Sequence, residues 1–74
     1  MIDDEKKVLK NKCHELFDML WYTKAGRTRR YIKLAKELGI PVKDCHFSMM
    51  DERTLRRAYE ILCRWVALLS RKRR

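Results

Sequence analysis

The sequence predicts an all-α protein, a small domain of three helices. Its 74 residues contain only two Gly and one Pro, which leaves few turns for a sheet. No stretch alternates polar and apolar residues over the length of a strand, whereas apolar residues recur at spacings of three and four in three segments. We therefore expect a single helical domain over residues 1–70 and a basic tail over residues 71–74.

The first helix is expected to begin at Asp3 or Asp4, because an acidic N-cap accepts free backbone N–H groups and favours the positive end of the helix dipole. The apolar positions that align on one face of this first helix are Leu9, Cys13, Leu16, Phe17 and Leu20.

The segment from Thr23 to Arg27 is interpreted as a turn, in which Gly26 is free to adopt a positive φ.

A second, shorter helix is expected to begin after Thr28 as its N-cap and to end at Gly39, a residue suited to the C-cap. Pro41 prevents its continuation. We expect one short helical turn around residues 42–45, then a packed connection. The apolar stripe of the helix is Tyr31, Leu34, Ala35 and Leu38, and the connection contributes Phe47, Met49 and Met50.

The third and longest helix is predicted to be capped by Asp51 and to run to about Ser70. Glu60 is placed four residues from both Arg56 and Arg64 and is expected to pair with them. The predicted core face is Leu55, Ala58, Tyr59, Leu62, Val66 and Leu69, widened by Ile61 and Trp65, and the opposite face carries Arg53, Arg57, Arg64 and Arg71.

Composition excludes several classes of protein. The chain is too short for a two-domain enzyme or a dinucleotide-binding fold, and its 46% hydrophobic content argues against wholesale disorder. No apolar run is long enough to span a membrane, and no signal-peptide pattern opens the sequence. A formal net charge of +9 favours a polyanionic partner.

The positive charge is unevenly distributed. Residues 1–23 carry a net charge of −1, whereas residues 24–46 and 47–74 each carry +5. The sharpest candidate for phosphate contact is the start of the second helix, where outward-pointing bases would meet free backbone N–H groups. The predicted nucleic-acid-binding residues are Lys24, Arg27, Arg29, Arg30, Lys33, Arg57, Arg64, Arg71, Arg73 and Arg74. For Arg57, Arg64 and the tail, a solvated surface without a ligand is the alternative interpretation.

The stretch from Leu34 to Ile40 is similar to the first helix and turn of a helix-turn-helix unit. A true unit would place a recognition helix three or four residues later, which requires a helix near residues 42–46. An ordinary helix end explains the same residues.

The cysteines predict buried thiols rather than a metal site. Cys13 and Cys45 are each followed by a histidine, but adjacent helical residues point about 100° apart and do not converge on one ion. The odd count, completed by Cys63, favours a reducing compartment. His14 is expected to hydrogen-bond Asp18. No catalytic constellation is present, so we expect no enzymatic activity, no metal and no cofactor.

One set of residues resembles a known family. The sequence over roughly residues 10 to 62 is similar to the C-terminal half of a phage-encoded family of zinc-finger-containing proteins of unknown function. The resemblance implies a phage or prophage origin. It also implies that a Cys-x-x-Cys zinc half precedes this region in family members, and we expect residues 1–74 to lack that half. The residues that carry the resemblance are His14, Phe17-Asp18, Leu20-Trp21, Arg29, Tyr31, Leu34-Ala35, Leu38-Gly39-Ile40, Cys45-His46 and Asp51.

Two functions are consistent with the sequence. The first is a small nucleic-acid-binding protein that contacts the phosphate backbone, with modest sequence preference. The second is a phage-encoded inhibitor or adaptor, such as an anti-CRISPR protein, that docks on an acidic groove of a host protein or uses Trp21, Tyr22 and Trp65 as anchors. Either function places the protein in the host cytoplasm, away from the membrane.

Overall fold

The computed structural model describes the backbone of residues 2–72 and the side chains of residues 5–70. It contains three α-helices, α1 (Ile2–Asp18), α2 (Lys24–Leu38) and α3 (Glu52–Lys72), and no strand over the described residues. Two 3-10 turns, η1 (Val42–Asp44) and η2 (Phe47–Met49), connect α2 to α3. The predicted three-helix architecture and the extra helical turn before the last helix are confirmed.

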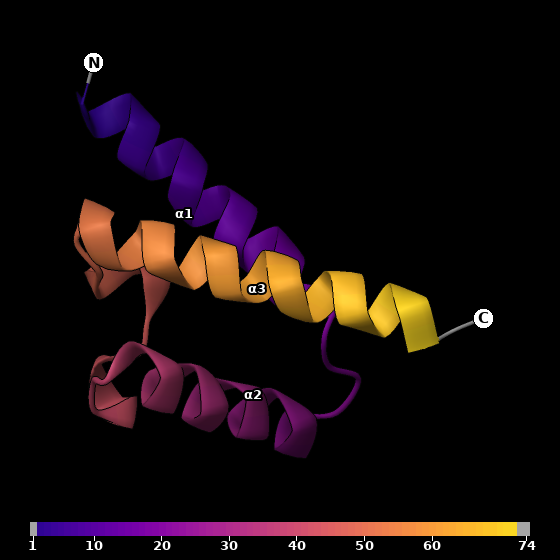
Figure 1. The fold of residues 1–74 in the computed structure, drawn as a ribbon. Coiled ribbons are helices and arrows are strands. Elements are labelled where there is room, and N and C mark those ends of the chain that lie inside the picture. The colour runs from indigo at the N-terminus through magenta and orange to yellow at the C-terminus, as the bar shows by residue number, and fades with distance from the viewer. Residues whose placement is uncertain (1, 73–74) are drawn as a thin grey trace.

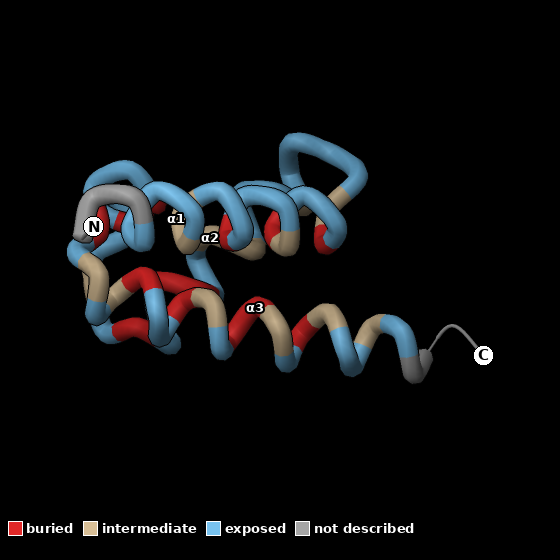
Figure 2. The backbone as a smooth tube through the Cα atoms, turned by 90° about the horizontal axis from the view of Figure 1, so that it is seen from above, coloured by how far each residue is buried: buried red, intermediate tan, exposed pale blue. Residues whose placement is uncertain are grey.

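The three helices pack as a triangle (Figures 1 and 2). Helices α1 and α3 run in the same direction, α2 runs in the opposite direction, and α3 lies against both of the others. The contact of α1 with α3 is more extensive than that of α2 with α3. Figure 2 shows buried positions on the side of α3 that faces α1 and α2, and exposed positions on its outer side.

An aromatic cluster reaches from the buried Phe17 and Phe47 to the half-buried Tyr31 at the edge of the core. The Phe17 ring lies 4.2 Å from the Tyr31 ring and 5.8 Å from the Phe47 ring, between centroids. The His14 ring packs edge-on against Phe47 at 4.9 Å. Over the described side chains His14 makes no hydrogen bond to Asp18, so the expected pair is replaced by this ring contact. The cluster ties α1 to α2 and η2.

The first helix begins at Ile2, which places Asp3 and Asp4 inside its first turn rather than at the N-cap position. After Asp18 the backbone tightens, because the Met19 N–H donates to the Leu16 carbonyl over 3.2 Å. Leu20, two residues beyond the helix, is still buried. The predicted apolar stripe therefore lies in the core, although its last member is outside the helix.

The predicted start of the second helix is wrong. Thr23, not Thr28, is the N-cap, and its hydroxyl accepts the N–H of Gly26 at 3.1 Å. Thr28 lies inside the helix, where its hydroxyl donates to the Lys24 carbonyl. Gly26 does not adopt positive φ; among the described residues only Gly39 does. The expected turn over residues 23–27 is therefore the cap and first turn of α2.

The predicted end of the second helix is confirmed. Gly39 is left-handed, with φ 71° and ψ 32°, and its N–H donates to the Lys36 carbonyl. The Ile40 N–H donates to the Ala35 carbonyl over 3.0 Å, which completes a Schellman-type end. The next α-helix begins only at Glu52, so no recognition helix follows within three or four residues and the helix-turn-helix interpretation is wrong.

The third helix begins as predicted, because Asp51 Oδ1 accepts the backbone N–H of Thr54 at 2.8 Å. Ile61 and Trp65, expected only to widen its core face, are buried, whereas Tyr59, Val66 and Leu69 are half-buried. The helix continues to Lys72, two residues past the predicted end.

The expected pairing of Glu60 is absent. Over the described side chains, Arg56 pairs instead with Glu52, at 3.8 Å. None of the described helices is both long enough and apolar enough to cross a bilayer.

Candidate nucleic-acid interface

A basic hollow lies beside the start of α2. We call it the α2 hollow; it measures about 390 Å³ and contains no acidic lining residue. Its positive charges come from Arg29, Arg30 and Lys33, which project from successive turns of one side of the helix. The full lining is Leu20, Trp21, Tyr22, Thr23, Gly26, Arg29, Arg30 and Lys33. Part of the predicted cluster is thus brought together in one concave surface.

Arg30 is held in place by the fold. Its Nε donates to the Leu20 carbonyl at 3.3 Å, and its guanidinium lies 5.7 Å from the centre of the Trp65 ring. The Lys33 ammonium lies over the same ring at 5.3 Å. Cations over an indole face are stabilised by the negative face of the ring. Trp65 therefore fixes two of the three charges while their outer sides remain toward solvent.

A second, smaller hollow adjoins the first between α2 and α3. Its volume is about 200 Å³, and its lining is Arg30, Lys33, Trp65, Leu68 and Leu69. Arg30 and Lys33 line both hollows, so we call the two together the basic groove.

The two predicted arginines of the third helix lie on the side of α3 next to this groove. Arg57 Nη2 donates to the Glu37 carbonyl of α2 at 3.5 Å. Arg64 is exposed and precedes Leu68 by one helical turn, so both side chains are on one face. Their positions extend the positive surface beyond the groove itself.

Lys24 and Arg27 do not line the groove. Arg27 turns to another side of α2, where its guanidinium lies 5.9 Å from the Trp21 ring and 5.2 Å from the Tyr31 ring. Lys24 is exposed in the first turn of the helix. Because α2 begins at Lys24, the basic residues of the groove, Arg29, Arg30 and Lys33, lie beyond the first turn of the helix. The expected combination of these bases with free N–H groups at the helix start is therefore wrong.

The charges of the groove are not neutralised by neighbouring acids. Over residues 5–70, whose side chains are described, the ion pair within 4.0 Å is that of Arg56 with Glu52. Arg29, Arg30 and Lys33 have no such partner, and the groove retains its full charge. The side chains of Arg71, Arg73 and Arg74 lie outside the described residues.

The sequence did not predict a second basic hollow, on α1. The net charge of residues 1–23 is −1, because the acidic residues of this segment outnumber its lysines. The hollow is lined by Lys6, Lys7, Lys10 and Ser48 and contains no acid in its lining. Lys6, however, is close enough to Asp51 to help lower the pKa of that carboxyl, after the larger effect of the Thr54 hydrogen bonds. Part of this charge is therefore balanced, and no aromatic ring lines the hollow.

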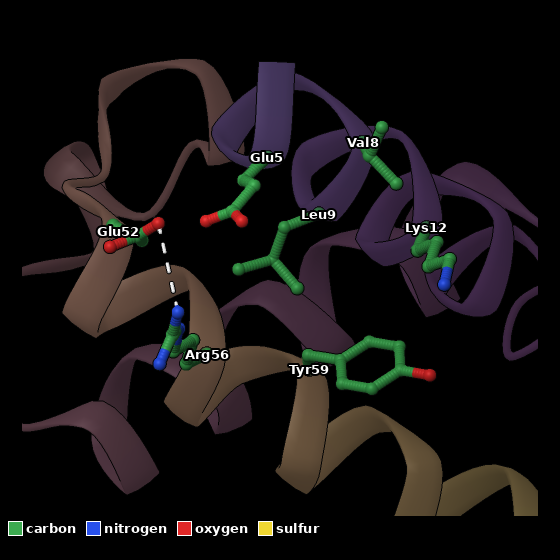
Figure 3. A pocket seen from close by; sticks show the side chains of 7 residues that line it. All are labelled: Glu5, Val8, Leu9, Lys12, Glu52, Arg56 and Tyr59. Carbon is green, nitrogen blue, oxygen red and sulfur yellow. Dashed lines mark ion pairs between the residues drawn. The ribbon is translucent and has the colours of Figure 1, made fainter. Parts of the chain in front are cut away.

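A further hollow lies between α1 and α3 (Figure 3). Its volume is about 420 Å³, and Val8 and Leu9 face Tyr59 across it. Glu5 and the Arg56–Glu52 pair stand at one end and Lys12 toward the other, so its charges balance. This α1–α3 groove is apolar at its centre, and the sequence pattern gave no sign of it.

The cysteines do not form a metal site. Cys13 is buried and donates its thiol proton to the Leu55 carbonyl at 3.7 Å, and Cys45 is also buried. Burial raises the pKa of each of these thiols to about 11, which disfavours the thiolate that binds metals. Over the described residues no three His, Cys, Asp or Glu side chains gather around one point.

Comparison with known protein families gives a match over most of the chain. Residues 1–65 match the sequence model of a family described as a zinc-finger-containing domain, DUF3268. This span is wider than roughly residues 10 to 62, the region that carries the sequence resemblance. No curated protein and no solved structure matches the chain significantly. The Cys and His residues described above do not fit the zinc ion that the family description implies.

Proposed function

The chain belongs to the zinc-finger-containing domain family, and we propose that it binds nucleic acid by contacting the phosphate backbone through the basic groove. The observation that carries this proposal is the acid-free set of Arg29, Arg30 and Lys33 in one concave surface. An arginine guanidinium can donate two hydrogen bonds to the oxygens of one phosphate. Three cations that have no ion-pair partner among residues 5–70 would displace counterions from a polyanion.

The arrangement favours backbone contact over base readout. The described helices include no recognition helix that would enter a major groove. Two basic side chains of the protein's groove, Arg30 and Lys33, are fixed beside Trp65. Arg57 and Arg64 supply further phosphate contacts along α3. In the phage context that the sequence resemblance implies, such a protein would bind host or phage nucleic acid with modest sequence preference.

Fluorescence anisotropy with labelled oligonucleotides tests the proposal. Three phosphate contacts predict that affinity falls on the order of twentyfold for a single strand, or fortyfold for a duplex, between about 50 and 200 mM salt. We expect Arg29→Ala to weaken binding at both concentrations and to reduce the salt dependence by about one contact.

Arg53→Ala is the matched control. Arg53 is an exposed arginine near the start of α3 and does not line the basic groove, so its loss removes the same charge elsewhere. Binding that weakens equally in the two variants would show a response to net charge rather than to the groove. Absence of binding at low salt would overturn the proposal.

A protein-docking role is the second candidate, and the α1–α3 groove favours it. Val8 is 52% exposed beside Leu9 and Tyr59, and apolar centres with a charged rim are typical of protein interfaces. Trp65 is buried and does not serve as an exposed anchor. This candidate predicts a specific host protein whose binding is lost in Val8→Glu and retained in Arg29→Ala; the reverse pattern favours the basic groove.

A further inference from the structure

Tyr22 is the most exposed of the large hydrophobic side chains over the described residues. It is 78% exposed, and it lines the α2 hollow together with the basic residues Arg29, Arg30 and Lys33. It stands in the short connection between α1 and α2, directly after the half-buried Trp21. An aromatic ring at the rim of a positively charged hollow is placed to meet a ligand that carries both a flat apolar face and negative charge.

The neighbouring aromatic side chains are less exposed than Tyr22. Trp65 is only 8% exposed, and its face is covered by Arg30 and Lys33. Trp21 lies under the Arg27 guanidinium. Among the aromatic residues that line the basic groove, Tyr22 has by far the largest exposed fraction.

Small residues line part of the hollow. Thr23 and Gly26 belong to the cap and first turn of α2, and Gly26 presents no side chain. A Cβ at this position would lie 3.4 Å from the Thr23 hydroxyl oxygen. Gly26 lies about one turn before Arg29 and Arg30 on the same side of α2, so the helix presents no side chain to the hollow at this position.

A duplex does not use such a ring, because the faces of its bases are stacked on one another. A single strand exposes base faces, and stacking of a base on an aromatic side chain adds to phosphate contacts without requiring a particular sequence. We propose that the basic groove binds single-stranded nucleic acid, with one unpaired base stacked on Tyr22 and the adjoining phosphates against Arg29 and Lys33. This inference rests on the proposed function and names its ligand class.

The experiment compares a labelled single strand with the duplex of the same sequence, using wild type, Tyr22→Ala and Tyr22→Phe. We expect the single strand to bind about tenfold more tightly than the duplex, given the contribution of one stacked base. Tyr22→Ala should lose about tenfold in affinity for the single strand and none for the duplex. Tyr22→Phe keeps the ring and should bind within about twofold of wild type.

An oligonucleotide with abasic sugars tests the same contact from the side of the ligand. It keeps every phosphate and removes the bases, so wild type should bind it about tenfold more weakly than the intact strand. Tyr22→Ala should bind the abasic and intact strands equally. This arm remains informative for wild type even if the alanine variant is poorly folded by circular dichroism.

The outcomes separate the two proposals. Duplex binding as tight as single-strand binding, together with no loss on the abasic strand, would overturn the stacking inference and leave the phosphate contacts of the groove intact. Absence of salt-dependent binding to either form would overturn the proposed function and this inference with it.

Discussion

Two adjacent arginines of α2 have different tasks. Arg30 is half-buried, donates to the Leu20 carbonyl just beyond the end of α1 and lies over Trp65. Leu20 lies in the connection between α1 and α2, where its carbonyl has no helical partner, and this bond gives that carbonyl a donor. Arg29 is exposed and makes no ion pair with a described side chain. Arg30 therefore supports the fold as well as the groove, whereas Arg29 serves the groove alone.

The two arginines should respond differently to truncation. Arg30→Ala should lower the free energy of unfolding by about 1–2 kcal/mol, because it loses a hydrogen bond and a cation–π contact. Arg29→Ala should change that free energy by less than about 0.5 kcal/mol. Urea denaturation of the two variants checks this, and equal destabilisation would contradict the division of tasks.

The cysteines should differ in reactivity for the same reason of environment. Burial raises the pKa of Cys13 and Cys45 to about 11, whereas Cys63 is half-buried. Iodoacetamide should label Cys63 first in the native protein and the other two only on unfolding, as peptide mass spectrometry would show. Preferential labelling of Cys13 would contradict the structure.

The buried thiols Cys13 and Cys45 should also make stability depend on pH. Because they resist ionisation in the folded state, the free energy of unfolding should fall as the pH rises from about 9 toward 11.

At the scale of the elements, the end of α2 could be predicted from the sequence, whereas its start could not. Gly39 and Pro41 mark the end of α2 unmistakably, because one suits the left-handed C-cap and the other stops the helix. The start of α2 offered two threonines, and only the folded chain selects Thr23, whose hydroxyl reaches Gly26. A glycine near two candidate caps is typical of a turn as well as of a helix's first turn, so the sequence did not decide between them.

The two glycines of α2 should give opposite effects on substitution. Gly26→Ala should stabilise the protein by about 0.5–1 kcal/mol, because alanine is the better helix former and its Cβ meets only ordinary contacts. Gly39→Ala should destabilise it by about 1 kcal/mol or more, because φ of +71° is strained for alanine. Thermal unfolding of both variants provides the measurement; a destabilised Gly26→Ala would argue against helix at that position.

The cap of α3 should make stability depend on pH. Hydrogen bonds from Thr54 hold the pKa of Asp51 below its usual 3.8, so the folded protein takes up this proton less readily than the unfolded chain. The stabilisation is present above that usual value and is lost as the pH falls through the lowered pKa. Asp51→Asn can keep the cap without the charge, so its melting temperature should fall less between about pH 5 and pH 3. Parallel melting curves for the two proteins would contradict this.

At the scale of the whole molecule, dividing the net charge by segment was a misleading guide to where basic side chains gather. The sequence correctly predicted that Arg29, Arg30 and Lys33 share a surface, because bases at spacings of one turn lie on one side of a helix. It did not show that Arg27 turns toward Trp21, or that three lysines of a nominally acidic helix share a hollow with Ser48. These arrangements depend on packing between elements that are distant in sequence.

The unequal packing of the helices has a further consequence, for the way the molecule opens. Because α2 rests on α3 over a smaller contact than α1 does, α2 should detach first in sub-global fluctuations. Its amide protons should then exchange with deuterium faster than those in the middle of α1 and α3. A ligand bound in the basic groove, as we propose, would contact both α2 and α3 and would therefore shift this opening equilibrium toward the closed state. Slowed exchange confined to α2 would therefore report occupancy of the groove without any label on the ligand.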